Sequence, residues 1–99
     1  MKRGSTPTHS FILPFDGELA SVVEITYSQN REIVLQKYQD DCEISANMVS
    51  VTLSQEETFS FVSGVNVEIQ IRVKDIAGKV HESSIVCVNC ERCLSEEVL

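Results

Sequence analysis

Residues 65–74, VNVEIQIRVK, alternate strictly between apolar and polar side chains and decide the fold class of this 99-residue chain. Successive side chains of a β-strand point to opposite faces, so a period of two predicts a strand with one buried and one solvated face. The apolar positions are Val65, Val67, Ile69, Ile71 and Val73, which we expect to face a core. Burial on one face only is typical of antiparallel sheets.

The same alternation recurs on both sides of this stretch. Further strands are predicted at 8–13, 21–28, 31–38, 42–45, 48–54 and 80–89. Turn residues such as Asp16-Gly17 separate them, and the two-residue link Ala46-Asn47 predicts a tight hairpin. We expect 21–28 to pair with 31–38, and 65–74 to pair with 80–89. The other side chains expected to face inward are Val23, Ile25, Tyr27, Ile33, Leu35, Val49, Val51 and Leu53.

One short helical turn is expected near residues 54–60. Ser54 and Glu57 match the capping box, in which each side chain accepts a hydrogen bond from the backbone N–H of the other residue. Phe59 and Phe61 follow, and we expect them to close one end of the core.

These elements predict an all-β fold, an antiparallel β-sandwich of about seven short strands. A small closed barrel is the alternative. The chain has no Trp, so "immunoglobulin-like" describes the architecture only. The length fits a single domain over residues 1–99. Within it we expect a flexible N-terminal arm at 1–7 and a C-terminal tail at 90–99, which frays or packs on a neighbour.

The formal net charge of −7 bears on partners and location. Proteins that bind nucleic acid or anionic membranes use clustered Lys and Arg, whereas the eight basic residues here are scattered. No stretch approaches the roughly 20 apolar residues of a membrane span, and the first 17 residues lack the apolar run of a signal peptide. We therefore expect no nucleic-acid or membrane partner, and a reducing, cytoplasmic location.

The stretch CVNCERC, residues 87–93, raises the question of a metal site. Cys87, Cys90 and Cys93 together with Cys42 would supply the four ligands that a structural zinc site needs. However, Cys42 has no second cysteine near it, and strand geometry places Cys87 and Cys90 on opposite faces. A redox pair at Cys90 and Cys93 would need a thiolate of low pKa, and no helix is predicted there to lower it. We favour Cys42 and Cys87 as small core residues and Cys90 and Cys93 as tail thiols, with no cofactor.

No organised catalytic site is evident, so we assign no catalytic residue and expect no enzyme. His9 and His81 lie in predicted strands without a nucleophile motif around them. Asp40-Asp41 with Glu43 lacks the regular ligand spacing of a calcium loop and is interpreted as a solvated turn. A ligand-binding sandwich would need exposed aromatic residues, and most of the six aromatics fall on inward positions.

The outward faces of the predicted strands carry many uncharged polar side chains and are not heavily charged. They carry Ser28, Ser50, Thr52, Ser54, Gln70, Ser83 and Ser84. Such faces tolerate burial against a partner better than rows of Lys and Glu, and sheet edges can pair between chains. We expect contact with a protein partner or self-association through sheet faces or edges. An ordinary solvated β-surface is the alternative.

Residues 6–99 resemble the short uncharacterised proteins encoded by prophages and tailed phages of Firmicutes. The resemblance rests on TPTHSFILPFD, VEITYSQNREIVLQKYQDDCEI, VSVTLSQEETFSF and VEIQIRVKDIAGKVHESSIVCVNCERCL. It implies a structural or accessory role in virion assembly, in the host bacterial cytoplasm or in the virion, and it assigns no functional residue. Our leading hypothesis is therefore a non-enzymatic protein–protein interaction or structural protein. The alternative is a small metal-binding module that uses the four cysteines.

Overall fold

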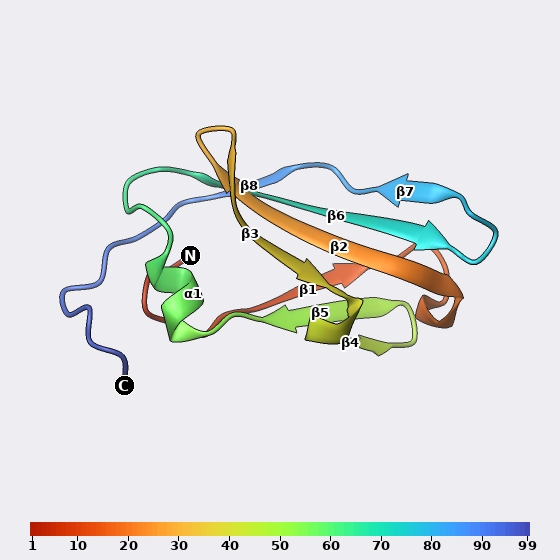
Figure 1. The fold of residues 1–99 in the computed structure, drawn as a ribbon, viewed down its shortest axis with the longest axis horizontal. Coiled ribbons are helices and arrows are strands. Elements are labelled where there is room, and N and C mark those ends of the chain that lie inside the picture. The colour runs from red at the N-terminus through yellow and green to blue at the C-terminus, as the bar shows by residue number, and fades with distance from the viewer.

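The computed structural model describes residues 1–99 and confirms the all-β prediction. Its strands are β1 (Thr8–Ile12), β2 (Ala20–Gln29), β3 (Glu32–Tyr38), β4 (Cys42–Ser45), β5 (Met48–Thr52), β6 (Val67–Asp75), β7 (Val80–Glu82) and β8 (Val86–Val88). The helical elements are α1 (Gln55–Phe59) and the 3₁₀ turns η1 (Gly17–Leu19) and η2 (Gln39–Asp41). Figure 1 shows their arrangement. No helix has the length and apolar character that crossing a membrane requires.

The strands form two antiparallel sheets. The small sheet has the order β1-β5-β4, and the large sheet has the order β3-β2-β6-β7, with β8 also paired to β6. The ladder between β2 and β6 forms the centre of the large sheet, where Ile25 lies opposite Ile71 and Tyr27 lies opposite Ile69. The stretch that predicted the fold, β6, thus pairs with three strands, β2, β7 and β8.

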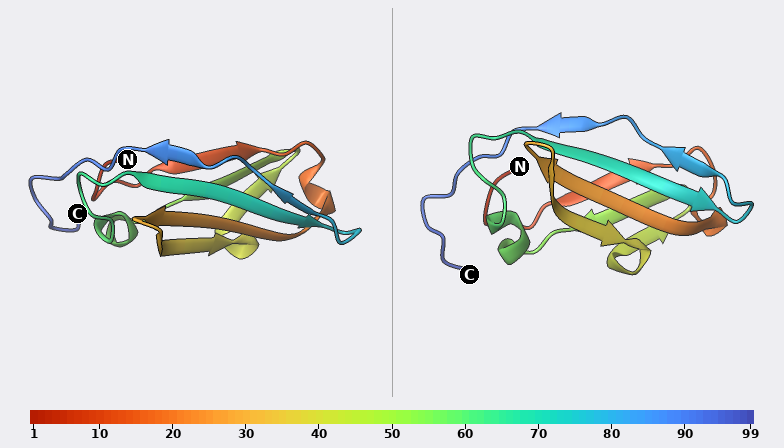
Figure 2. Two further views of the ribbon diagram at one scale, coloured as in Figure 1. Left: turned by 90° about the horizontal axis from the view of Figure 1, so that it is seen from above. Right: turned by 45° about the horizontal axis from the view of Figure 1, so that its top comes forward.

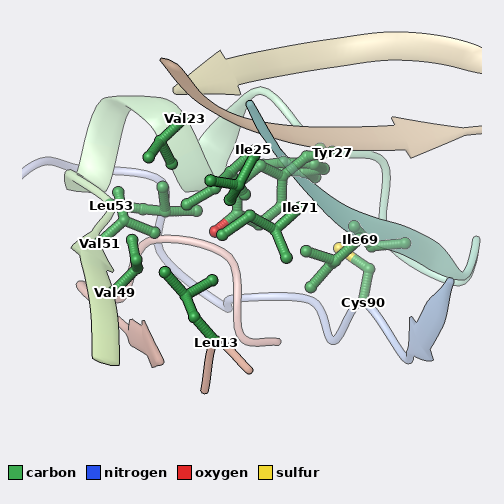
Figure 3. Close-up of a cluster of buried hydrophobic side chains, with 13 residues drawn as sticks. Leu13, Val23, Ile25, Tyr27, Val49, Val51, Leu53, Ile69, Ile71 and Cys90 are labelled. Atoms are coloured by element: carbon green, nitrogen blue, oxygen red, sulfur yellow. The ribbon is translucent and has the colours of Figure 1, made fainter. Parts of the chain in front are cut away.

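The core lies between the two sheets. The large sheet contributes Val23, Ile25, Tyr27, Val67, Ile69, Ile71 and Val73, and the small sheet together with its flanking residues contributes Leu13, Val49, Val51 and Leu53. Figure 3 shows these side chains meeting in one cluster. β2, β5 and β6 bury alternate residues, because the pleat turns every second side chain toward the facing sheet. The predicted inward positions on 21–28, 48–54 and 65–74 are confirmed, apart from a half-buried Val65.

The strand order differs from that of an immunoglobulin domain. There the second strand belongs to the sheet of the first, fourth and fifth strands. Here β2 lies between β3 and β6 in the large sheet, and β5 pairs instead with β1 and β4. The likeness to immunoglobulins is therefore limited to the two-sheet architecture.

One expected core residue, Ile33, is 62% exposed. The cause is a break in register between β2 and β3, where Tyr27 lies opposite Leu35 and Ser28 lies opposite Ile33. Val34 is the extra residue of this bulge. A one-residue insertion reverses the faces of the side chains beyond it, so Leu35 still packs on the core while Ile33 turns outward.

The strand predicted at 80–89 is interrupted. β7 and β8 both pair with β6, but Ser83–Ile85 leave the regular ladder. Ser83 explains the break, since its hydroxyl accepts a hydrogen bond from the Ile71 amide at 3.1 Å and its carbonyl accepts one from Gln70 Nε2 at 3.0 Å. A side chain thus replaces one backbone partner of β6.

The predicted capping box forms at α1. The Ser54 hydroxyl accepts a hydrogen bond from the Glu57 amide at 3.1 Å, and the Glu57 carboxylate accepts one from the Ser54 amide at 2.9 Å. Phe61 is buried in the core, whereas Phe59 is half-buried under the guanidinium of Arg3, which lies 5.5 Å from the ring centroid.

The N-terminal arm and the C-terminal tail lie side by side. Arg3 donates its amide to the Glu91 carbonyl at 3.0 Å, and its guanidinium contacts the Glu96 carboxylate at 2.6 Å and the Phe59 carbonyl at 3.0 Å. The molecule measures 46 × 27 × 16 Å. Both termini lie at the α1 end of its long axis, and η1 and the β6–β7 loop lie at the other end (Figures 1 and 2).

Candidate interaction surface

The outer face of the small sheet is lined mainly by hydroxyl side chains. We call it the hydroxyl face. The alternation of β1, β4 and β5 turns Thr8, Ser10, Ile12, Glu43, Ser45, Met48, Ser50 and Thr52 away from the core. Glu43 is the only charged residue among them. Ile12 and Met48, which lie opposite each other, give one end an apolar character, with 70% and 39% exposure.

The hydroxyls of this face hydrogen-bond across strands. Thr8 and Thr52 are joined at 2.7 Å between their Oγ1 atoms, and Ser10 and Ser50 at 3.0 Å between their Oγ atoms. A polar group costs little to remove from water when it already has a hydrogen-bond partner. The hydroxyl face can therefore be covered by a partner at a smaller desolvation cost than a charged surface.

The outer face of the large sheet carries a charged cluster beside uncharged residues such as Thr26 and Gln70. Arg72 on β6 lies between Glu24 on β2 at 3.6 Å and Glu82 on β7 at 3.3 Å. These ion pairs cross three strands and remain partly exposed. Covering them would remove several charges from water at once, so the part of this face around Arg72 is suited to solvent.

The edges formed by β1 and β4 of the small sheet and by β3 of the large sheet are protected against strand addition. β1 is flanked by Pro7 and Pro14, which have no amide hydrogen, and β4 is only four residues long. β3 carries the bulge, and the inward Lys37 forms an ion pair with Glu57 at 2.5 Å. Bulges, prolines and inward charges are the features that natural sheets use to prevent edge pairing. The expected contact is therefore better placed on a face than on an edge.

A second feature is an open hollow of about 440 Å³ at the end of the molecule opposite the termini, which we call the distal hollow. It is lined by Pro14, Phe15, Leu19, Asp75, Ile76, Ala77, Lys79 and His81. His81 Nε2 lies 3.1 Å from Asp75 Oδ2, and the Phe15 ring lies 4.9 Å from the imidazole. The volume falls in the roughly 300–1,000 Å³ range of ligand pockets.

Asp75 organises the loop beside the distal hollow. Its Oδ1 accepts hydrogen bonds from the amides of Ala77 and Lys79, both at 2.9 Å. The hydrogen bond from His81, followed by these amides, lowers the pKa of the Asp75 carboxyl below its usual value. The carboxylate is therefore engaged within the loop, and the Lys79 ammonium beside it forms no ion pair.

His9 lies on the inner side of β1, the edge strand of the small sheet, opposite Val51. Its Nδ1 is 2.7 Å from the Tyr27 hydroxyl, and the Tyr27 ring packs edge-on against Phe61 at 6.0 Å. Burial, followed by the positive charge of the N-terminus, lowers the pKa of His9. Burial also raises the pKa of Tyr27. Both groups are therefore neutral near pH 7, and together they bridge the two sheets.

Cys42 packs against the core as predicted, but Cys87 and Cys90 do not lie where the sequence predicted them. Cys90 is buried at 4% exposure and lies in the core with Ile69 (Figure 3), whereas Cys87 is exposed on β8. The strand alternation accounts for this, because Cys87 lies opposite the outward Glu68. Cys42 and Cys93 are half-buried and unpaired. No three His, Cys, Asp or Glu side chains lie close enough together to hold a metal ion, so the four-cysteine site is not assembled.

Gln29 is a structural residue that lies just beyond the strand predicted at 21–28 and forms the end of β2. It is 5% exposed, donates from Nε2 to the carbonyls of Val62 at 2.8 Å and Val65 at 3.0 Å, and accepts from the Val62 amide at 2.8 Å. Gln29 continues the inward series Val23, Ile25, Tyr27, and this period was the signal that could have placed it inside.

Comparisons of the chain with protein-family models, curated proteins and solved structures found no match.

Proposed function

We propose that this chain is a non-enzymatic structural protein that binds another protein through its hydroxyl face. The observation that carries the proposal is the contrast between the two outer faces. One displays hydroxyls that are already hydrogen-bonded, with Ile12 and Met48 at its end, and the other displays the ion pairs of Arg72. Interface cores are depleted of charge, so the hydroxyl face is the better docking surface.

The charge of the chain favours a partner other than a second copy on this face. Copies with a net charge of −7 repel each other, and the hydroxyl face has no cation to offset Glu43. A neutral or basic sheet surface of a different protein avoids this repulsion. The resemblance to proteins of prophages and tailed phages suggests the setting, and we propose a virion or its assembly in the bacterial cytoplasm.

Site-specific photo-crosslinking tests this proposal. A photoreactive amino acid at Met48 samples the hydroxyl face, and the same group at Val22, which is 46% exposed, samples the outer face of the large sheet. In the cells or particles that naturally contain the protein, we expect a crosslinked protein from position 48 and none from position 22.

Substitutions that place charges on the hydroxyl face test whether the crosslink depends on that face. The double variant Ser10→Lys, Ser50→Lys should abolish the crosslink from position 48, because it places two cations where hydroxyls pair. The control Val22→Lys should leave that crosslink intact. Equal crosslinking from both faces, or none from Met48, would show that the hydroxyl face is an ordinary solvated surface.

A further inference from the structure

The negative charge of the chain is distributed unevenly between the two sheets. Residues 4–19 and 39–60, which form the small sheet and its flanking helical elements, contain seven acidic residues and no Lys or Arg. We call them the small-sheet half. The rest of the chain, which includes the whole large sheet, contains eight acidic and eight basic residues. The entire net charge of −7 therefore belongs to the small-sheet half.

Most of this charge is free to act on a partner. Only Glu57 is neutralised within the chain, by Lys37 of β3. The other six acidic residues of the small-sheet half are exposed and form no ion pair; they are Asp16, Glu18, Asp40, Asp41, Glu43 and Glu56. The charge imbalance is thus displayed at the surface.

Three of these carboxylates border the hydroxyl face along β4. Asp40 and Asp41 belong to η2 immediately before this strand, and Glu43 lies on the face itself, opposite Ser50. Burial, followed by the negative charge of Asp41, raises the pKa of the Cys42 thiol at the start of β4. The hydroxyl face is therefore a mainly uncharged surface with a negative potential along one edge.

We infer that the partner of the hydroxyl face is a basic protein, which places Lys and Arg side chains along the β4 edge. This inference rests on the proposed function and adds the chemistry of the partner. Interfaces combine an uncharged centre with a polar rim, and opposite charges at the rim speed association and exclude wrong partners. The same negative potential repels nucleic acid and anionic membranes, so the basic partner is a protein.

A second copy of the chain does not offer such a surface. Outside the small-sheet half its acidic and basic residues are equal in number, and Arg72 on the large sheet is already engaged by Glu24 and Glu82. Two small-sheet halves placed face to face would each bring the full charge of −7 to the contact. The charge distribution therefore favours a different chain.

Two variants with the same net charge test the inference, each carrying the photoreactive amino acid at position 48. The first neutralises the β4 edge by Asp40→Asn, Asp41→Asn and Glu43→Gln. The matched control removes three unpaired charges outside the small-sheet half by Glu32→Gln, Glu68→Gln and Glu97→Gln. The asparagine at position 41 keeps an oxygen for the hydrogen bond from the Tyr38 amide, and circular dichroism checks both folds.

We expect the first variant to weaken the crosslink from position 48 at least about threefold, the combined effect of three weak exposed ion pairs. The control should leave the crosslink unchanged. Raising the salt from about 0.1 M to about 1 M shortens the Debye length from roughly 10 Å to roughly 3 Å, so it should weaken the crosslink of the natural chain more than that of the first variant.

A carbodiimide, which couples a carboxylate to a lysine amine in direct contact, identifies the charged groups that meet. Mass spectrometry should find Asp40, Asp41 or Glu43 joined to lysines of the protein that position 48 captures. Coupling only through acidic residues outside the small-sheet half would contradict the inference.

The outcomes separate this inference from the proposed function. A crosslink from position 48 that neither the first variant nor salt weakens would overturn the inference and leave the hydroxyl face as a docking surface. A second copy as the crosslinked protein would overturn the inference as well, because no basic partner would then be required. The absence of any crosslink from position 48 would remove the proposed function and the inference with it.

Discussion

The hydroxyl of Tyr27 lies 2.7 Å from Nδ1 of His9, and this hydrogen bond joins the large sheet to the small sheet through the core. Tyr27 is completely buried, and its ring also contacts Phe61. The bond satisfies a polar group that would otherwise be buried without a partner, and it specifies how β1 lies over β2. The other contacts between the two sheets are mostly apolar, and they constrain the orientation of one sheet on the other less strongly.

Removing this hydroxyl should destabilise the fold. Tyr27→Phe leaves the His9 nitrogen without its partner, and we expect a loss of about 1–2 kcal/mol in the free energy of unfolding, measured by urea denaturation. Tyr38→Phe is the matched control, because Tyr38 is 46% exposed and its hydroxyl bonds only Gln36. Similar losses in both variants would mean that the His9–Tyr27 bond contributes nothing specific.

Stability should fall as the solution is acidified through the titration of His9. Burial holds the folded-state pKa of His9 below its usual 6.5, so the unfolded chain binds the proton more readily. The stability that the neutral His9 contributes is fully present above pH 6.5. It is lost as the pH falls through the lower pKa that His9 has in the folded state. His9→Gln, which does not titrate, should flatten this part of the stability profile measured by thermal unfolding between pH 7 and pH 5. His81→Gln should leave the His9 contribution in place.

The capping box of α1 should contribute measurably to the free energy of unfolding. Ser54→Ala removes the acceptor for the Glu57 amide, and we expect a loss of about 1 kcal/mol. Ser60→Ala at the other end of the helix should have a smaller effect, since its exposed hydroxyl only adds a bond to the Glu56 carbonyl. The free energies of unfolding of the two variants are measured by guanidinium denaturation. A larger loss in Ser54→Ala indicates a specific cap, and equal losses indicate a general effect on the helix.

Gln29→Leu should be more damaging than any of these changes. It removes three hydrogen bonds that hold the loop at Val62 and Val65, and it leaves these partly buried backbone groups without a protein partner. We expect about 3 kcal/mol of destabilisation and faster amide exchange at Val62. Gln36→Leu, whose amide contacts Thr26 on the outer face of the sheet, is the control. A loss below about 1 kcal/mol would show that the loop finds other partners.

The thiols should react in an order set by burial. Alkylation of the folded protein, followed by mass spectrometry, should modify the exposed Cys87 first and Cys90 last. Burial also raises the pKa of Cys90 and Cys42, which reduces the reactive thiolate at both positions. In denaturant all four should react alike. Rapid modification of Cys90 in the native protein would show that the segment after β8 opens easily.

The hydroxyl face illustrates what could and could not be predicted from the sequence. Alternation alone placed Ser50 and Thr52 outward, and they are. It could not show that Thr8 and Ser10 lie opposite them, because the pairing of β1 with β5 spans about 40 residues and depends on which strands meet in the folded core. Ser54 was expected both on such a face and in a capping box, and it is the cap of α1.

The sequence by itself determined the all-β class, the strands around Val23–Tyr27, Val49–Leu53 and Val67–Val73, and the cap at Ser54, because these depend on the local periods of the chain. The tertiary structure alone decided the bulge that exposes Ile33, the burial of Cys90, and the separation of the tail from the distal hollow. These features depend on which distant segments pack together, and a local pattern carries no information about that choice.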